Sequence, residues 1–510
     1  MQLSPAILKE IKHKNIQLPD EHLFALPEKV LQFGTGVLLR ALPDYFIDKA
    51  NKKGLFNGRV VVVKSTAKGG TDAFDAQHHL YTHCVRGIED GHEVVENIIN
   101  ASISRVLHAA TQWHDVLRCA HNPDLQIIIS NTTEVGIELV EEDINTGVPR
   151  SFPGKLLAFL LARYTAFGGS ERSGMVVIPT ELLVDNGPLL KSIVVQLARY
   201  NNLPQDFITW LETHNRFCSS LVDRIVPGLP GDEQRALLDM ELGYKDDLLI
   251  VSEAYRLWAI EGDEKTAEAA SFAAADAGVI IAPDIERYRE LKLRLLNGTH
   301  TLSCGLALLS GFDTVRDAMS NAMFETYVMR LMQDEIAPAI PYPLSEEETR
   351  SFGNQVLDRF RNPHLQHHWI SISMQYSSKI KMRVVPLLLH HYQKNTTAPQ
   401  LMALGFAAYV LFTKPVKEEG GSYTGYTNGN AYPIQDNHAD FFMQAWQQTS
   451  PEAVVRQVLG NREFWDHDLT QLPGFAAAVT SHLDNLIKES AAAVVKACIN
   501  AANAPAALIQ

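Results

Sequence analysis

Phe33-Gly34-Thr35-Gly36-Val37-Leu38 is the stretch that decides the fold of this chain. A short apolar run at residues 28–32 precedes it, and a helix-like stretch follows it to about Lys53. The next segment, residues 59–64, contains four consecutive valines, which is typical of a strand buried on both faces of a parallel sheet. The order strand, glycine turn, helix and strand predicts an α/β fold.

The glycine turn also indicates a ligand. Without side chains, Gly34 and Gly36 let the backbone turn tightly and let a pyrophosphate approach the amide groups of a helix N-terminus. The pattern is incomplete, because Leu39 replaces the third glycine of Gly-x-Gly-x-x-Gly. The strand-helix-strand context still favours a dinucleotide site over a plain turn. The candidate cofactor contacts here are Phe33, Gly34, Thr35, Gly36, Val37 and Leu38.

Charge alone does not decide between NAD and NADP. An acidic residue near the end of the second strand would favour NAD, but this strand ends at Lys64 and is followed by Ser65 and Thr66. Lys64 and Lys68 suit the 2′-phosphate of NADP, or they lie in a solvated loop.

A later apolar strand, residues 125–129, leads into Ser130, Asn131 and Thr132. Ligands in open α/β sheets bind beyond the carboxyl ends of the strands, so these three residues are candidates to line a nicotinamide pocket. Small polar residues are also common in turns, and both interpretations stay open.

Composition sets outer limits on the function. A chain of 510 residues with 46% hydrophobic and 20% charged residues is expected to fold into two large globular domains. The net charge of −14 argues against binding to nucleic acid or to an anionic membrane. An anionic substrate would therefore need local positive charge at its site.

Targeting and redox features are sparse. No stretch reaches the roughly 18 uncharged apolar residues that span a bilayer, and residues 1–14 lack the apolar core of a secretory signal. The cysteines are widely spaced and contain no Cys-x-x-Cys pair: Cys84, Cys119, Cys218, Cys304 and Cys498. This spacing predicts reduced thiols in a cytoplasmic protein, without a structural zinc site.

Helical periodicity dominates from residue 284 onward, which predicts a boundary between a domain at 1–283 and a second domain at 284–510. An apolar helix expected at 284–309 carries Lys292, Asn297 and His300. On an α-helix, Asn297 lies about 140° and His300 about 80° around from Lys292, so the three share one broad face. Clefts between domains commonly bind substrates, which makes this helix a candidate for the active site.

These three residue types suit proton transfer at a carbonyl or alcohol. A lysine can act as an acid or base, while an amide and an imidazole donate hydrogen bonds to an oxygen that gains charge. The alternative is a lysine that extends to solvent and two polar groups satisfied within the fold. Reach is a difficulty, because Lys292 and His300 are separated by about 12 Å of helix rise.

Several motifs in order resemble a known family. They are Lys292, Asn297 and His300 in the spacing Lys-x-x-x-x-Asn-x-x-His, then Val222-Asp223-Arg224-Ile225-Val226-Pro227, Arg359-Phe360-Arg361-Asn362-Pro363 and Ser378-Lys379-Ile380. Together they make the chain similar to the polyol-specific long-chain dehydrogenases, also called the mannitol dehydrogenase family. Asn215 departs from the signature, which has an apolar residue there.

The resemblance implies a Rossmann-type N-terminal domain, a mostly α-helical C-terminal domain and metal-independent hydride transfer with NAD. It implies that Lys292 is the general acid/base, that Asn297 stabilises the oxyanion, and that His300 and Lys379 contact the substrate. Asp223 is a further candidate substrate contact, although a structural ion pair between Asp223 and Arg224 is the simplest interpretation of that motif.

Departures from the family pattern point to its hexuronate branch. Leu182 stands where polyol enzymes carry a second asparagine, Ser371 stands where they often carry an arginine, and a Tyr-rich insertion occupies residues 418–432. This resemblance implies interconversion of D-tagaturonate and D-altronate. The substrate carboxylate then needs a cation, for which Arg383 is the first candidate and Arg294 the second, unless either forms a surface ion pair.

Other functions remain in view. One alternative is a mannonate (fructuronate) or polyol dehydrogenase of the same family, and another is a non-catalytic nucleotide-binding sensor. The Lys-Asn-His set favours an enzyme, because a sensor needs no general base. The expected partner is a small sugar acid; oligomeric state and reaction direction are open. The Gly-rich segment at residues 418–422 predicts a mobile loop.

Overall fold

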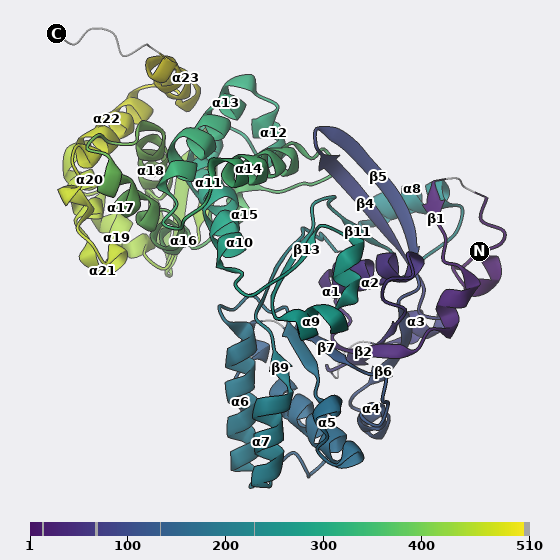
Figure 1. Cartoon of the computed structure of the whole chain (residues 1–510). Coiled ribbons are helices and arrows are strands. Elements are labelled where there is room, and N and C mark those ends of the chain that lie inside the picture. The colour runs from purple at the N-terminus through teal and green to yellow at the C-terminus, as the bar shows by residue number, and fades with distance from the viewer. Residues whose placement is uncertain (13–14, 67–69, 133, 229, 504–510) are drawn as a thin grey trace. The chain divides into compact units, whose positions relative to one another are not determined.

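The computed structural model describes residues 1–510 apart from 13–14, 67–69, 133, 229 and 504–510. The chain divides into two compact units (Figure 1), the first made of Met1–Gly87 and His92–Ile285, the second of Ile88–Gly91 and Glu286–Gln510. The sequence predicts a boundary after residue 283 and does not predict that Ile88–Gly91 groups with the second unit. Within that unit the amide of Gly91 donates to the carboxylate of Asp358 at 3.1 Å.

A six-stranded parallel sheet forms the centre of the first unit. Its strands are β2 (Glu28–Phe33), β3 (Arg59–Lys64), β6 (Ile103–His108), β7 (Ile127–Ser130), β8 (Val176–Pro179) and β9 (Arg216–Phe217). They lie in the order β6-β3-β2-β7-β8-β9, and every neighbouring pair is parallel. Numbered along the chain, this is the order 3-2-1-4-5-6 of doubly wound dinucleotide-binding sheets. The predicted Rossmann-type fold is confirmed.

Both faces of this sheet are covered, which explains the unbroken valine run of β3. Val60 and Val62 belong to one hydrophobic cluster, whereas Val61 and Val63 belong to another, because successive side chains of a strand point to opposite faces. The first cluster contains residues of α1 (Val37–Ala41) and α2 (Pro43–Lys52). The second contains residues of α4 (Trp113–Cys119), α5 (Phe152–Phe167), α6 (Asn186–Tyr200) and α7 (Gln205–His214).

Two smaller sheets and several short helices complete the first unit. One sheet has the order β1-β5-β4-β11 and the other the order β10-β12-β13. Their bounds are β1 (Ile16–Gln17), β4 (Tyr81–Glu89), β5 (His92–Asn100), β10 (Ser220–Asp223), β11 (Ile250–Ser252), β12 (Leu257–Glu261) and β13 (Val279–Ala282). The short helices include α3 (Asp72–Ala76), α8 (Asp232–Leu242) and α9 (Glu264–Ala269).

The second unit is mostly helical. Its helices are α10 (Glu286–Leu291), the π-helical η6 (Lys292–Gly298), α11 (Thr299–Leu309), α12 (Val315–Met319), α13 (Ala322–Arg330), the π-helical η7 (Leu331–Ile336), α14 (Glu346–Arg361), α15 (Trp369–Ile372), α16 (Tyr376–Arg383), α17 (Val385–Lys394), α18 (Gln400–Phe412), α19 (Ala439–Ala445), α20 (Pro451–Leu459), α21 (Arg462–Trp465), α22 (Phe475–Lys488) and α23 (Ala491–Asn503). Among the described residues, no helix is both long enough and apolar enough to cross a bilayer.

Helices α11 and α18 pack closely against each other within this unit (Figure 1). Two glycines allow the approach: a Cβ added to Gly405 would lie 2.6 Å from the carbonyl oxygen of Leu302, and one added to Gly305 would lie 2.9 Å from that of Ala408. Such distances exclude any larger residue without a shift of backbone. This contact fixes α11, and with it the segment that carries the candidate catalytic residues.

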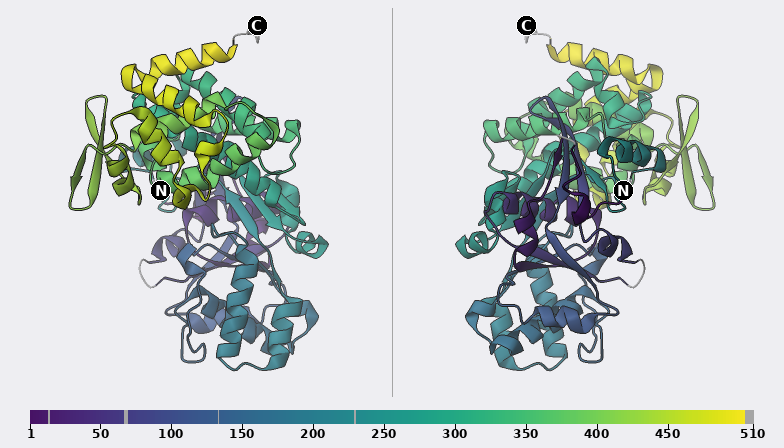
Figure 2. Two further views of the ribbon diagram at one scale, coloured as in Figure 1. Left: turned by 90° about the vertical axis from the view of Figure 1, so that its left-hand side faces the viewer. Right: turned by 90° about the vertical axis from the view of Figure 1, so that its right-hand side faces the viewer.

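The Tyr-rich insertion forms a small antiparallel sheet of β14 (Lys417–Glu419), β15 (Ser422–Thr427) and β16 (Asn430–Ile434), which projects from the helical unit (Figure 2). Gly420 and Gly421 form the turn between β14 and β15 with φ of 57° and 83°, values that favour glycine. Residues 418–422 are therefore a tight hairpin turn with its flanking strand ends, and not the irregular loop that the sequence predicts.

Candidate active site

A cavity of about 580 Å³ lies at the carboxyl ends of β2, β3 and β7 in the first unit. In a sheet of this order, dinucleotides bind where the strand order reverses, which is between β2 and β7. Five of the predicted cofactor contacts line the cavity: Gly34, Thr35, Gly36, Asn131 and Thr132.

The other four predicted contacts do not line it. Phe33 is fully buried, with its ring 5.2 Å from that of Phe152, and Ser130 is buried and donates to Glu181 at 3.1 Å. Val37 and Leu38 pack against the hydrophobic core. These four residues pack behind the turn. The sequence motif alone cannot distinguish them from the residues that face the cavity.

The two glycines of the turn have different roles. Gly34 has a φ of 130°, and a Cβ added to it would lie 2.7 Å from Leu39 Cδ1 and 3.1 Å from the carbonyl oxygen of Asn131. Gly36 has an ordinary φ of −63°, and nothing lies within 4 Å of a Cβ added there. Gly34 is thus required by the packing of the turn, whereas Gly36 leaves open space at the cavity. That space fits the pyrophosphate of a dinucleotide.

Alanine substitutions should separate these roles. Gly34→Ala is expected to lower the thermal midpoint, because the strained φ costs roughly 1–3 kcal/mol and the new methyl group meets Leu39. Gly36→Ala should fold like the natural chain, yet weaken NADH binding about tenfold or more, a loss of about 1.4 kcal/mol. Thermal unfolding and NADH titration of both variants test this. Equal loss of stability in both would contradict the assignment.

Two lysines of the cavity wall anchor loops. Lys64 Nζ donates to the carbonyl oxygen of Thr66 at 2.7 Å and to its hydroxyl at 2.8 Å, and Lys155 Nζ donates to the carbonyl oxygen of Arg150 at 2.7 Å. Lys68 lies outside the described residues.

Sequence reasoning missed Glu181, which ties the loops after β7 and β8 together. Its buried carboxylate accepts from the amide of Thr132 at 2.8 Å and from the hydroxyl of Thr132 at 2.9 Å. Asn131 donates to the hydroxyl of Thr180 at 2.9 Å. Burial raises the pKa of Glu181, and the hydrogen bonds from Thr132 and Ser130 oppose that rise. The adjacent Leu182 is 60% exposed and provides no donor.

A second buried carboxyl lies near the glycine turn. Gln32 Nε2 donates to Asp44 Oδ2 at 3.2 Å, and both side chains are fully buried. Burial raises the pKa of Asp44 to about 7, against the lowering effect of Gln32 and Arg40. Asp44 Oδ1 and Gln32 Oε1 have no hydrogen-bond partner among the described residues. A proton on Asp44 therefore provides a donor where acceptors are in excess.

Asp44 predicts a pH dependence of stability. Its folded pKa of about 7 lies above its unfolded value of 3.8, so its stabilising contribution is full below about pH 4 and is lost as pH rises through about 7. Asp44→Asn should remove this loss, so that its thermal midpoint falls less than that of the natural chain between pH 5 and pH 8. The exposed Asp75→Asn is the matched control. Parallel pH profiles for the natural chain and Asp44→Asn would show that Asp44 is ionised when folded.

In the second unit, the segment that carries Lys292 and Asn297 is a π-helix, η6, between α10 and α11. The α-helical spacing predicted for it is wrong. In a π-helix hydrogen bonds join residues five apart, so residues at i and i+5 lie closer to one side of the helix than they do in an α-helix. Lys292 and Asn297 are five apart, and the π turn therefore aligns them better than the sequence periodicity indicates. Short π segments are frequent at functional sites.

Lys292 and Asn297 are both half-buried. The main-chain carbonyl of Asn297 accepts a hydrogen bond from the Thr301 hydroxyl at 2.7 Å. The side-chain amide of Asn297 makes no hydrogen bond to any described residue, which leaves its donors available to a ligand.

His300 is only 7% exposed and lies in an aromatic environment. Its ring stacks on Phe360 with centroids 4.1 Å apart, and the rings of His367 and Trp369 meet it nearly at right angles at 5.1 and 5.8 Å. Burial, then the charges of neighbours including His367 and Arg359, holds the pKa of His300 well below its usual value. The imidazole is thus neutral, and its buried Nε2 has no hydrogen-bond partner among the described residues.

Three cations lie close enough to this histidine for their charges to act on it. Arg359, Lys379 and Arg383 all lower the pKa of His300 through their charge. Lys379 Nζ donates to the carbonyl oxygen of Ile372 at 2.8 Å, and burial is the main cause of its lowered pKa, followed by the charge of Arg383. We name Arg359, Lys379 and Arg383 the cationic cluster.

Arg383 and Arg294, the two candidates for the carboxylate anchor, differ in their partners. Arg294 is buried and bound to the Glu290 carboxylate at 2.9 Å, so the structure contradicts it as an anchor for a substrate. Arg383 donates to the Thr301 hydroxyl at 3.1 Å, and its buried Nε has no partner among the described residues. Burial lowers the pKa of Arg383 to about 10, so it remains cationic at neutral pH.

Tyr376 holds α16 against α11. Its hydroxyl donates to the carbonyl oxygen of Thr301 at 2.6 Å and accepts from the amide of Gly305 at 2.9 Å. Lys379 and Arg383 belong to α16, so this buried tyrosine fixes their helix relative to His300.

Asp223 lies in the first unit, buried at the end of β10. The neighbouring Arg224 donates to the carbonyl oxygens of Ala41 at 2.6 Å and of Glu253 at 3.0 and 3.1 Å, and lies over the ring of Tyr45. Main-chain oxygens therefore bind the guanidinium of Arg224, for which the sequence motif suggests an ion pair with Asp223.

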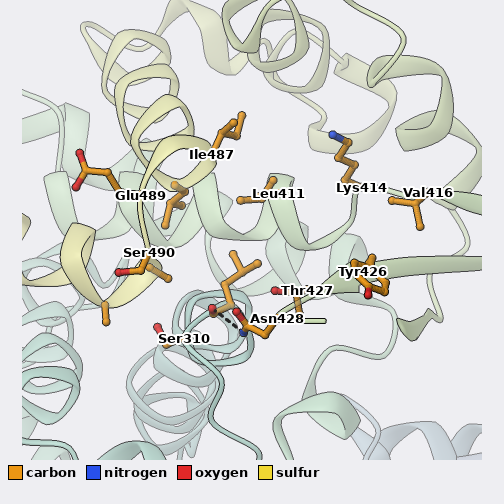
Figure 3. Close-up of a pocket in the computed structure, with 14 residues that line it drawn as sticks. Ser310, Leu411, Lys414, Val416, Tyr426, Thr427, Asn428, Ile487, Glu489 and Ser490 are labelled. Atoms are coloured by element: carbon orange, nitrogen blue, oxygen red, sulfur yellow. Dashed lines mark hydrogen bonds between the residues drawn. The ribbon is translucent and has the colours of Figure 1, made fainter. Parts of the chain in front are cut away.

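A separate cavity of about 430 Å³ lies beside the β15–β16 turn (Figure 3). Asn428 from the turn donates to the carbonyl oxygen of Leu309 at 3.1 Å, and Lys414 and Glu489 are among the lining residues. Lys292, Asn297, His300 and the cationic cluster do not line this cavity, so we do not assign the chemistry to it.

Comparisons with known proteins cover nearly the whole chain. Residues 28–272 match the mannitol dehydrogenase Rossmann domain, and residues 284–487 match the mannitol dehydrogenase C-terminal domain. The altronate oxidoreductase of Halalkalibacterium halodurans is 38% identical over 485 residues, which cover 93% of this chain and 94% of that protein. That of Cronobacter sakazakii is 37% identical over 472 residues, which cover 91% and 95%.

Solved structures show the same fold. The chain is similar to Pseudomonas fluorescens mannitol 2-dehydrogenase in ternary complex with NAD and D-mannitol, with a TM-score of 0.69, 22% identity, and coverage of 98% of this chain and 100% of that chain. It is also similar to a substrate-free D-sorbitol dehydrogenase, with a TM-score of 0.78, 19% identity, and coverage of 97% and 100%. The chain therefore belongs to the mannitol dehydrogenase family and is an oxidoreductase that acts on the CH–OH group of a sugar.

Proposed function

We propose that this enzyme interconverts D-tagaturonate and D-altronate with NAD as its cofactor. The cationic cluster carries the proposal: Arg383 is partly buried and cationic, and no acidic side chain among the described residues pairs with it. A buried, uncompensated cation is costly unless an anion binds to it. The relatives named altronate oxidoreductase, at 37 and 38% identity, support a substrate with a carboxylate.

The charge of the protein as a whole strengthens this argument. With a net charge of −14, the chain repels anions on average, so a substrate carboxylate needs concentrated positive charge. Arg359, Lys379 and Arg383 provide it on α14 and α16 around one neutral histidine. A guanidinium can bind a carboxylate through two parallel hydrogen bonds, which fixes the orientation of the sugar acid.

The first unit would hold the cofactor. The open space at Gly36 and the cavity wall formed by Thr35, Asn131 and Thr132 fit a dinucleotide. When bound, the nicotinamide supplies the hydride for reduction of the ketone.

The residues of the second unit would transfer the proton and stabilise the negative charge that develops on the substrate oxygen. Protonated Lys292 donates a proton to the ketone oxygen during reduction, and neutral Lys292 removes it from the alcohol in the reverse direction. The side-chain amide of Asn297 donates a hydrogen bond to the same oxygen as negative charge develops on it. Neutral His300 and Lys379 are the proposed further contacts to the sugar.

A substrate panel tests the proposal. The purified enzyme is given D-tagaturonate, D-fructuronate or D-fructose, each with NADH and with NADPH, and absorbance of the reduced nicotinamide is followed. We expect the highest kcat/KM with D-tagaturonate and NADH, about 10²-fold or more above D-fructose, because the neutral ketose cannot use the cationic cluster. A preference for fructose would favour a polyol dehydrogenase. NADH binding without ketone-dependent oxidation would favour a nucleotide sensor.

A further inference from the structure

His367 is an imidazole beside the candidate site that no motif singles out. It lies in the segment between α14 and α15, half-buried, with its ring 5.1 Å from that of His300 at an interplanar angle of 85°. The amide of Val315 donates to its carbonyl oxygen at 2.9 Å and so fixes its backbone. Neither ring nitrogen hydrogen-bonds to a described residue.

The neighbours of His367 are cationic. Burial lowers its pKa most, and the charges of Arg359, His368 and Lys379 lower it further. Two of these groups, Arg359 and Lys379, belong to the cationic cluster. A neutral imidazole has one nitrogen that donates and one that accepts.

The hydrogen-bonding chemistry of a sugar acid defines what this site needs. Lysine and arginine side chains only donate, and a carboxylate only accepts, so the cationic cluster satisfies the carboxylate alone. The substrate also has a hydroxyl next to that carboxylate, and its O–H group needs a hydrogen-bond acceptor when the substrate leaves water. Leaving this donor without an acceptor costs about 1–3 kcal/mol of binding free energy. His300 is mostly buried, and His367, half-buried beside it, is the more accessible of the two imidazoles.

We propose that His367 determines specificity by accepting a hydrogen bond from the substrate hydroxyl adjacent to the carboxylate. This inference rests on the proposed function. The cations bind the carboxylate of the sugar acid, and the hydrogen bond to His367 depends on the configuration of the neighbouring carbon. Substrates that lack this hydroxyl, or carry it with the opposite configuration, lose the hydrogen bond.

The test compares His367→Phe, His367→Gln and His368→Phe with the natural enzyme. Phenylalanine keeps a flat ring against His300 but has no acceptor, and glutamine restores one. His368 is the matched control, because it is adjacent and its ring pairs with Asp313 at 3.2 Å at the surface. His367→Phe should raise KM for D-tagaturonate about 10- to 100-fold and change kcat less than about threefold. His367→Gln should regain most of the loss, and His368→Phe should keep KM within about twofold.

An analogue lacking the hydroxyl next to the carboxylate makes the test specific. For the natural enzyme, kcat/KM should be about 10- to 100-fold lower on this analogue than on D-tagaturonate. For His367→Phe, kcat/KM should be about equal on the two compounds. Calorimetric titration of D-altronate into each enzyme saturated with NAD should show the same weakening without turnover. His367→Leu replaces the phenylalanine variant if that one does not fold.

The possible failures can be told apart. If the natural enzyme does not turn over any keto-hexuronate, the proposed function falls. If it does turn over D-tagaturonate, but His367→Phe has an unchanged KM or loses kcat alone, the inference about His367 is wrong. An equal loss on substrate and analogue would likewise overturn it, because His367 would then act only through packing.

Discussion

Lys292→Ala is expected to lower kcat for reduction of D-tagaturonate by about 10²–10⁴-fold, the effect typical of a positioned general acid or base. The π-helix η6 carries Lys292 and Asn297 five residues apart, which aligns them toward one side of the helix. In the proposed mechanism both side chains act on the ketone oxygen of the substrate. Without the amine, water must donate the proton. Single-turnover oxidation of NADH, followed by absorbance in a stopped-flow instrument, measures this step.

Two further variants define the cause of the loss. Lys292→Arg keeps the positive charge but cannot exchange its proton at neutral pH, so it should be nearly as slow as alanine. Lys381→Ala is the matched control, since its amine pairs with Asp466 at 2.9 Å on an exposed surface, where such a pair contributes little. Near-normal turnover by folded Lys292→Ala would refute its role as the general acid/base.

Arg383→Met should raise KM for D-tagaturonate by about 10²-fold or more, because truncating one partner of a buried charge pair costs about 2–5 kcal/mol. It should change KM for the neutral D-fructose much less. Arg383→Lys should recover only part of the affinity, because an ammonium cannot form the bidentate contact of a guanidinium. Steady-state kinetics with both substrates measures the effect.

The control for Arg383 is Arg361→Met, which removes a guanidinium that pairs with Glu325 at 2.7 Å on the surface. Its KM values should stay near those of the natural enzyme. Arg383 also donates to Thr301, so a purely structural role must be considered. A purely structural role would weaken the binding of D-tagaturonate and of D-fructose equally. That result would show that Arg383 is not the carboxylate anchor.

Continuous apolar runs made the central sheet predictable. The valines of β3 and the isoleucines of β7 are apolar without alternation, as expected for strands covered on both faces. Strand β4 gave no such signal, because it buries polar residues that have partners: the Thr82 hydroxyl lies 2.9 Å from that of Tyr244, and His83 lies 2.7 Å from the Ser252 hydroxyl. Those partners are more than a hundred residues away in the chain, beyond the range of any local pattern.

The site shows the same division. The spacing of Lys292, Asn297 and His300 indicates one helix as the candidate, but it predicts an α-helical period where the structure has a π-helical segment. The sequence ranks Arg383 before Arg294 as the carboxylate anchor, but only the structure shows the Glu290 carboxylate that holds Arg294. It also could not single out His367, whose proposed role rests on its ring contact with His300 of α11.

The sequence by itself determined the parallel sheet, its glycine turn and the helix that carries Lys292, because burial on both faces, tight turning and side-chain spacing are local properties of the chain. Tertiary structure alone decided which glycine the packing of the turn requires, how a π turn aligns Lys292 with Asn297, and which cations lie near His300. Those features depend on side chains brought together from separate elements, and packing, which no short stretch encodes, sets their distances.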